Sequence, residues 1–306
     1  MSPDETRSVM MDREGWLWIG SDSSGLSRMK DGRIERLPLR SSNPALEPGV
    51  LAMEQRRDGS VATGTSDGVY LVENGRAKAA PATWGVGGTA VRAIVEDQQG
   101  NLWIGGEGLG VVIIQADGSR RSDALAARLP KHGVRCLLAD KAQGMWVGTD
   151  EGLVHVGPER NQRYSSGRGG LPHESVQALL QTDDGALWIG TAGGLARLRN
   201  GQMRQWTRGD GLRDERIFSL IDDRSGGIWI NSPSGIYGLR VSNLEGGPEG
   251  SGIPVGSAIL GARYGIIGGT YRGGAQPATA RGQSGELYFT SRSEERRVGK
   301  ECRLTC

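Results

Sequence analysis

The chain has little of what marks several common protein classes. Its 3 cysteines, Cys136, Cys302 and Cys306, form neither a disulfide framework nor a metal-binding spacing. No stretch approaches the roughly 20 apolar residues that a membrane-spanning helix needs. The opening residues, MSPDETRSVMM, lack the basic and apolar regions of a signal peptide. These absences argue against a disulfide scaffold and against a membrane span within this sequence.

Concentrated charge and catalytic motifs are also missing. The formal net charge is +2, and the last fifteen residues alone hold five Lys or Arg against three Glu. The rest of the chain is neutral, so no nucleic-acid partner is expected, because phosphate binding needs a basic face. The sequence contains no Gly-x-Ser-x-Gly motif, no phosphate-binding loop and no metal-ligand spacing. We therefore predict no catalytic residues, no metal and no cofactor.

Glycine, by contrast, is abundant, at 51 of 306 residues, and it recurs at fixed places in a repeat. The repeat is seen most clearly in the phrase GALWIGTAGGLARLRNG (185–201). Its Trp serves as a reference position, with equivalents spaced near 42 residues apart, a period typical of four-stranded propeller blades. The seven reference positions are Trp18, Ala62, Trp103, Trp146, Trp188, Trp229 and Tyr288.

Each copy predicts four short strands. An inner strand precedes an Asp-x-x-Gly turn, the Trp phrase forms the second strand, and a Gly-apolar pair begins the third. A hairpin turn, which we expect to be type I′, then leads to an outer strand such as RIERLPL or QMRQWT. The four turns concerned are Asp31-Gly32, Asn74-Gly75, Asp117-Gly118 and Asn200-Gly201. We predict an all-β fold: a seven-bladed β-propeller of four-stranded antiparallel blades over residues 1–291, with the last blade truncated.

The recurrent Trp is interpreted first as a packing residue. A four-stranded sheet cannot cover its own faces, and neighbouring blades in a radial array would bury them. Identical placement in five copies favours an indole wedged between blades over a catalytic or ligand-stacking role. Ten positions before the reference stands a small residue in six copies, and Cys136 occupies this place in one of them. We therefore interpret Cys136 as a packing residue and not as a nucleophile.

These repeats resemble the two-component regulator propeller family. VQALLQTDDGALWIGTAGGLARLRNG (176–201) carries the family pattern of inner strand, Asp-x-x-Gly, Leu-Trp-Ile-Gly-Thr and Gly-Leu, and the resemblance covers about residues 6–291. YGIIGGTYRGGAQPATARGQSGELYFTS (264–291) resembles the closing segment of the family. The resemblance implies the extracytoplasmic sensing part of a membrane receptor, followed by a β-sandwich, a membrane helix and a histidine kinase or diguanylate cyclase. For some members it implies oligosaccharide ligands.

The last residues depart from the repeat. RSEERRVGKEC (292–302) resembles the translation of a sequencing-adapter oligonucleotide, and we exclude residues 292–306 from the fold as a non-native tail. A solvated charged terminus is the alternative. If the tail is an artefact, the natural protein is longer, and neither end of this chain need be its real terminus.

Strand alternation fixes which turns share a face. The Asp-x-x-Gly and hairpin turns lie on one side, the turn face. The turns between second and third strands and the connections between blades lie on the other, the loop face. The loop face carries the more varied segments, where binding usually resides. The same face also carries Arg7, residues 41–47, Trp84 and residues 214–216, which we do not include in the predicted site. The predicted ligand-binding residues are Arg92, Lys131, His132, Arg135, Asp150, Glu151, His173, Glu174, Gln177 and Arg213.

Such a set suits a polar or anionic ligand, because arginine pairs with carboxylate or sulfate and carboxylates accept hydrogen bonds from sugar hydroxyls. We expect a ligand-sensing module that binds a small polar molecule or oligosaccharide, performs no chemistry and acts within a receptor homodimer. The family places it in the periplasm, attached to the inner membrane only through downstream segments. A propeller lyase or hydrolase acting on a glycan or lactone, and a protein-interaction scaffold, are the alternatives.

Overall fold

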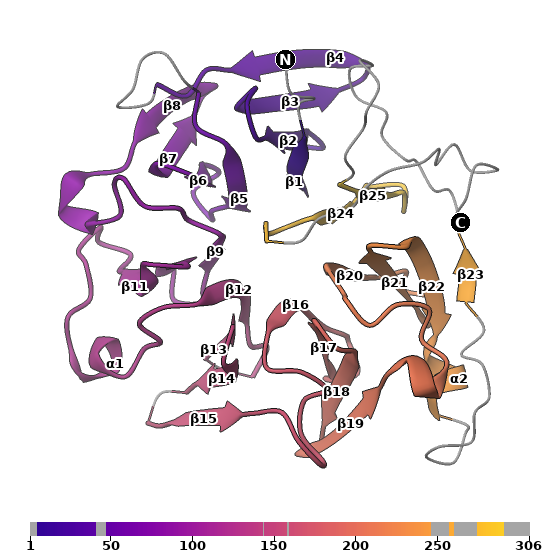
Figure 1. Ribbon diagram of the computed structural model, residues 1–306. Helices are drawn as coiled ribbons and strands as arrows, with labels where there is room; N and C mark the ends of the chain where they lie inside the picture. The colour runs from indigo at the N-terminus through magenta and orange to yellow at the C-terminus, as the bar shows by residue number, and fades with distance from the viewer. Residues whose placement is uncertain are drawn as a thin grey trace.

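The computed structural model describes residues 5–40, 47–142, 144–157, 159–245, 257–259 and 274–290. The predicted tail at 292–306 and most of the candidate loop at 41–47 lie outside these residues. The described chain forms small antiparallel sheets arranged radially around a centre (Figure 1). The all-β propeller prediction is confirmed.

Five blades have four strands, joined in sequence order from the centre outward. The first contains β1 (Thr6–Met11), β2 (Leu17–Ser21), β3 (Leu26–Lys30) and β4 (Arg33–Leu37). The second contains β5 (Val50–Gln55), β6 (Val61–Thr65), β7 (Gly68–Glu73) and β8 (Arg76–Ala79). The fourth contains β12 (Val134–Ala139), β13 (Met145–Thr149), β14 (Gly152–Val156) and β15 (Asn161–Tyr164).

The fifth blade contains β16 (Val176–Gln181), β17 (Leu187–Thr191), β18 (Leu195–Arg199) and β19 (Gln202–Trp206). The sixth contains β20 (Ser219–Asp222), β21 (Gly227–Ser232), β22 (Gly235–Arg240) and β23 (Ser257–Ile259). Helices are short: α1 (Ala124–Ala127), α2 (Val241–Glu245) and two 3-10 turns, Ala82–Trp84 and Arg208–Asp210.

Two copies of the repeat are irregular. The third blade has three strands, β9 (Ala93–Glu96), β10 (Leu102–Gly106) and β11 (Gly110–Ile114), and its outer strand is reduced to an isolated bridge between Ile114 and Arg120. The seventh copy contributes only β24 (Thr279–Arg281) and β25 (Leu287–Phe289). The described residues therefore form six blades, not the seven predicted, together with a two-stranded seventh sheet.

The inner strands contact one another in cyclic order, with β24 between β20 and β1. Each seam between neighbouring sheets holds a hydrophobic cluster, and the reference Trp residues lie in these clusters. Trp188, for example, is 1% exposed and packs with residues of the sixth blade such as Ile230. The prediction that the indoles pack between blades is confirmed.

Close packing at the seams explains the glycine that follows the Trp by two positions. A Cβ atom on Gly190 would lie 2.5 Å from Cγ2 of Ile217 in the next blade, and one on Gly105 would lie 2.5 Å from Cγ1 of Val134. The second blade has Ala62 at the reference position, and there Trp84 from the following connection is buried in the same seam. The loop-face candidate Trp84 is thus a packing residue, and its indole nitrogen donates to Gly118 O at 3.1 Å.

The hairpin turns are as predicted in three blades. Asp31, Asn74 and Asn200 have φ values of 51°, 49° and 51°, and the glycine after each is also positive. Such paired positive φ values are those of a type I′ turn. The prediction is wrong for Asp117-Gly118, where only Gly118 has a positive φ. This turn differs because its loop has three residues, closed by a bond from the Gln115 N–H to Ser119 O, and only the last of them, Gly118, has a positive φ.

Candidate functional site

A β-bulge near the start of the inner strand marks the loop-face end of four blades. The pairing register skips one residue in each, and the skipped residues are Arg7, Leu51, Arg135 and Gln177. A bulge leaves its extra residue outside the ladder and redirects the side chain. Arg92 occupies the equivalent place just before β9. We call these five residues and their partners the channel mouth.

The channel-mouth arginines pair with carboxylates of their own blades. Arg7 Nη2 lies 2.5 Å from Asp22 Oδ2, and Arg92 Nη2 lies 2.9 Å from Glu107 Oε2. Each acid stands fifteen residues after its arginine, in the turn between second and third strands. The pairs are partly exposed: Arg92 is 27% and Glu107 is 63% accessible. Solvent can therefore reach both partners.

The fourth blade has the same pair. Arg135 Nε donates to Asp150 Oδ1, again at a spacing of fifteen residues. Ser175, at the start of the fifth blade, donates to the same oxygen at 3.4 Å. The structure thus brings the predicted residues Arg135 and Asp150 together, at a corner where two blades meet.

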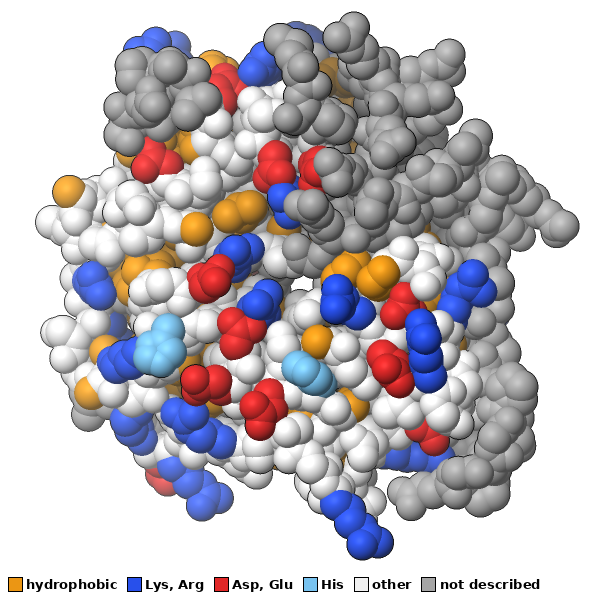
Figure 2. All heavy atoms as spheres, in the orientation of Figure 1, with side chains coloured by type: hydrophobic (Ala, Val, Ile, Leu, Met, Phe, Trp, Pro, Cys, Tyr) orange, Lys and Arg blue, Asp and Glu red, His pale blue; other side chains and the backbone are white. Residues whose placement is uncertain are grey.

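Three arginines at the channel mouth face a comparable number of acids. Arg7 also lies 3.7 Å from Glu5, so each guanidinium has at least one carboxylate beside it. Figure 2 shows blue and red side chains intermixed around the central opening of this face. The mouth is therefore close to electrically balanced, and it offers both hydrogen-bond donors and acceptors.

His173 and Glu174 are exposed residues of the connection that leads into the fifth blade. His173 Nδ1 accepts from the Ser175 N–H at 2.9 Å, whereas Glu174 Oε1 accepts from Ser166 Oγ at 3.1 Å. The two side chains thus have different partners. This arrangement does not form an acid–base pair.

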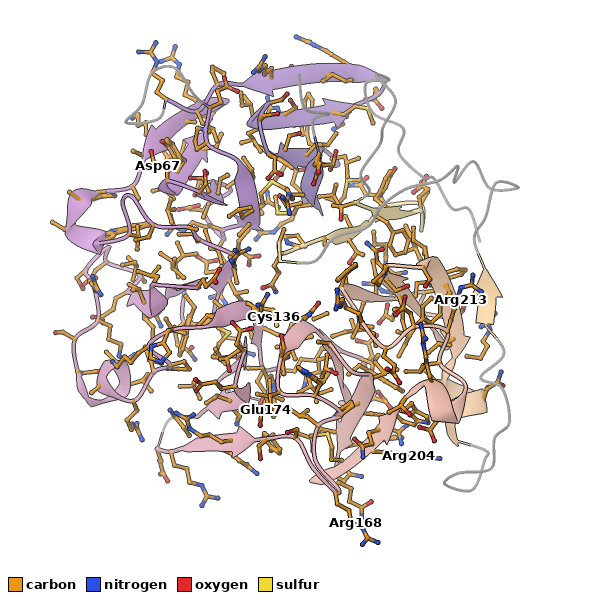
Figure 3. The ribbon with its side chains drawn as sticks, viewed as in Figure 1. Asp67, Cys136, Arg168, Glu174, Arg204 and Arg213 are labelled. Carbon is orange, nitrogen blue, oxygen red and sulfur yellow. The ribbon has the colours of Figure 1, made fainter. Side chains whose placement is uncertain are left out.

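The remaining predicted residues lie on connections of the loop face. Lys131, His132, Glu151 and Arg213 are all exposed. Lys131 Nζ donates to Ala126 O at 3.3 Å, within its own connection. In Figure 3, Arg213 lies toward the outer edge of the ring, well away from Glu174. Glu151 directly follows Asp150 in the chain, so it stands beside the Arg135–Asp150 pair.

A neighbouring acid has a structural role. Asp214 is 7% exposed and accepts from Ser234 Oγ at 2.6 Å. Burial acts to raise the pKa of Asp214, but the hydrogen bonds from Ser234 and Arg216 outweigh it and the pKa lies below its usual value. Asp214 therefore remains charged as an internal anchor of the sixth blade.

Cys136 is buried at the small-residue place of β12, near the centre of the ring (Figure 3). Burial raises the pKa of its thiol to about 12. A thiol that stays protonated is a poor nucleophile, in keeping with the packing role inferred from the repeat.

Within the described residues, no group of three or more His, Cys, Asp or Glu is placed to hold a metal ion. The helices in the same part of the chain are all too short or too polar to cross a membrane.

The sequence analysis missed two kinds of channel-mouth residue. Asp22 and Glu107 were not predicted, although the fifteen-residue spacing from Arg7 and Arg92 is visible in the sequence. Gln276 was not considered as a site residue. It stands where five other copies carry Val or Ile, and this departure from the repeat was the available signal.

Comparison with known proteins supports the repeat assignment. Residues 85–108 and 170–193 match the family model described as Two component regulator propeller. No curated protein sequence matches the chain.

Solved structures share the fold. The extracellular domain of a B. thetaiotaomicron protein assigned as a hybrid two component system has a TM-score of 0.74 and 22% identity, over 95% of this chain and 38% of that one. An extracellular domain assigned to a one component system of the same organism has a TM-score of 0.71 and 20% identity, over 95% and 37%. A streptogramin B lyase has a TM-score of 0.72 and 12% identity, over 99% and 93%.

The chain thus spans less than two fifths of each of the two extracellular domains, and nearly all of the lyase is covered. At these identities the similarity establishes the fold alone. Together, the fold and the family matches show a β-propeller in which residues 85–108 and 170–193 match two component regulator propeller repeats.

Proposed function

We propose that this propeller is the ligand-sensing module of a bacterial two-component or diguanylate cyclase receptor. The observation that carries the proposal is the set of arginine–carboxylate pairs at the channel mouth, which recurs in three blades at one spacing. The pairs are partly exposed, and their arginines stand at one place of the repeat, where the inner strands begin near the centre of the ring. The repeats and the fold shared with two receptor extracellular domains support the sensor role.

The charge balance of the mouth favours a neutral polyhydroxylated ligand, such as an oligosaccharide, over a strongly anionic one. Each guanidinium already has a carboxylate partner, so an anion would gain little net attraction. Sugar hydroxyls can accept from arginine and donate to the paired acid at once. The sequence alone led us to expect a polar or anionic ligand, and the charge balance favours the neutral polar kind.

In this proposal the propeller works outside the cytoplasm and its output domain lies in a part of the receptor beyond this chain. Ligand would change signalling only by binding one arrangement of a receptor dimer better than the other. The two-stranded seventh sheet would be the inner half of a seventh blade. The propeller itself would carry out no reaction.

Titration calorimetry against neutral and uronate-containing oligosaccharides tests the proposal. We expect binding to the neutral sugars and a loss of at least tenfold in affinity for Arg135→Ala. Arg199→Ala is the matched control, because Arg199 pairs with Asp184 at 3.4 Å on the opposite, turn face. Equal losses in both variants, or no binding to any sugar in the panel, would overturn the proposal.

A propeller lyase is the second candidate, favoured by the match to streptogramin B lyase over 93% of that enzyme. It would need an acid and a base that converge on the substrate. His173 and Glu174 are the adjacent candidates, and their separate partners, Ser175 and Ser166, argue against this function. Turnover of a glycan or lactone that disappears in His173→Ala would support the lyase and exclude the proposal of a purely binding module.

A further inference from the structure

A short segment before the seventh sheet runs across the centre of the ring. We call residues 274–277 the crossing segment. The Gln276 N–H donates to Leu51 O at 2.9 Å, and its carbonyl accepts from the Met53 N–H at 3.1 Å. These bonds form a parallel bridge to β5 of the second blade. The chain then continues into β24 of the seventh sheet, and Figure 1 shows this yellow part of the chain reaching into the middle of the ring.

The Gln276 side chain extends the crossing to another blade. Its Oε1 accepts from the Leu137 N–H at 2.8 Å, and its Nε2 donates to Leu137 O. Leu137 belongs to β12, the inner strand of the fourth blade. One glutamine therefore joins the channel edges of two inner strands from non-adjacent blades.

Two further bonds attach the crossing segment to the ring. The Val9 N–H of β1 donates to Pro277 O at 2.9 Å. Arg92 Nη1 donates to Gly274 O at 3.1 Å, while Nη2 of the same guanidinium holds Glu107. The segment is thereby bonded to residues from the first, second, third and fourth blades.

Arg92 thus belongs both to the channel mouth and to the attachment of this segment. Its Nε is buried without a hydrogen-bond partner. Arg135, the equivalent arginine of the next blade, pairs with Asp150 and Ser175 lies beside that acid. Of these two arginines at the same place of the repeat, it is Arg92 that binds Gly274.

We propose that the crossing segment is a strap that couples the channel mouth to the seventh sheet through Arg92. A ligand that takes hydrogen bonds from the Arg92 guanidinium competes with Gly274 O. Losing that bond loosens the strap, and with it the bonds to β1, β5 and β12. Because the strap continues directly into β24, a ligand bound at the channel mouth changes the stability of the seventh sheet, β24 and β25. The role of a ligand in this series of events rests on the proposed function. The coupling between Arg92 and the strap does not depend on it.

Hydrogen–deuterium exchange without any ligand tests the coupling. Arg92→Ala removes the bond to Gly274, and we expect about tenfold faster exchange of the Val9, Met53 and Leu137 amides, because bonds to a charged donor are among the stronger ones. Arg135→Ala is the matched control and should leave the exchange of Val9 and Met53 unchanged.

Gln276→Ala calibrates the experiment, since it removes the acceptor of the Leu137 N–H directly. Faster exchange at Leu137 in Gln276→Ala, with Arg92→Ala indistinguishable from Arg135→Ala at Val9 and Met53, would overturn the coupling. Failure of every oligosaccharide to bind would refute the proposed function and leave this result standing. The two inferences can therefore fail separately.

Discussion

The two faces of the ring differ in how far their polar contacts reach. On the turn face, hydrogen bonds run from one blade to the next: the Arg13 N–H donates to Gln55, the Arg57 N–H to Glu96 and the Lys141 N–H to Gln181. On the loop face, the arginine–carboxylate pairs stay within their own blades.

The turn-face bonds hold neighbouring blades together, whereas the loop-face pairs leave polar groups exposed at the channel mouth. The inter-blade bonds of the turn face follow the blade period, at separations of 42, 39 and 40 residues, and Gln283 in the seventh sheet donates to Arg13 O at 3.4 Å. A group bonded to a neighbouring blade must give up that bond before it can bind a ligand. The loop-face ion pairs themselves join no two blades, although Arg92 also donates to Gly274 O and Asp150 also accepts from Ser175.

The comparison assumes that the apolar seams beneath both faces carry most of the stability, and Gly190 tests that assumption. Gly190→Ala places a Cβ 2.5 Å from Ile217 Cγ2, so it should lower the free energy of unfolding by about 3 kcal/mol through overpacking. Urea denaturation measures the loss. Gly87→Ala, where a Cβ meets no atom within 4 Å, is the control and should change little. Equal effects would show that the seams are looser than the contacts indicate.

Glu54 sharpens the comparison because it is a half-buried acid at the turn-face end of β5. Burial raises its pKa to about 7, helped by the nearby charge of Glu96 and opposed by the Glu96 N–H and Arg13. A raised pKa means that the folded state binds the Glu54 proton more tightly than the unfolded state does. The stabilisation of the fold by this bound proton is complete below about pH 4.5 and is lost as the pH rises through 7.

Glu54→Gln should therefore be more stable than the wild-type protein at pH 8, by about 2 kcal/mol, and no more stable at pH 4. Thermal unfolding at the two pH values measures this crossover. Glu73→Gln, at the exposed end of β7, should show no pH-dependent difference. A stabilisation of Glu54→Gln that is the same at pH 4 and pH 8 would contradict the explanation.

The smallest effect compares one arginine from each face. Arg57 donates to Gln98 O at 2.6 Å and to Asp97 O at 3.0 Å, both in the next blade. Arg57→Ala should cost about 1 kcal/mol of unfolding free energy. Arg135→Ala, which breaks a partly exposed pair within one blade, should cost less than about 0.5 kcal/mol. If denaturant titration shows a larger loss of unfolding free energy for Arg135→Ala than for Arg57→Ala, the proposed difference between the two faces is wrong.

Local pattern was enough to predict most of the fold. The 42-residue period, the buried Trp residues and three of the four hairpin turns follow from side-chain volume and from the positive φ that Asn-Gly and Asp-Gly accept. The loop-face placement of Arg92, Arg135 and Asp150 followed from strand alternation. Whether they bind a ligand stays a prediction.

The features that could not be predicted from the sequence depend on contacts between copies of the repeat that are distant in the chain, or on departures from the repeat. Trp84 lies outside the repeated phrase, and only the ring geometry places it in the seam beside Ala62. The third blade's missing outer strand and the two-stranded seventh sheet are departures from the period, which the period itself does not predict. The Gln276 bonds to Leu137 join residues 139 positions apart, across the centre of a closed ring.

The bulges of the inner strands have an evolutionary consequence. A bulged residue is skipped by the pairing between its strand and the next, so replacing its side chain leaves the ladder intact. Arg7, Leu51, Arg135 and Gln177 differ widely in chemistry on the same backbone. Selection can therefore change the chemistry of these channel-mouth residues one position at a time, while the strand pairing that displays them is inherited unaltered.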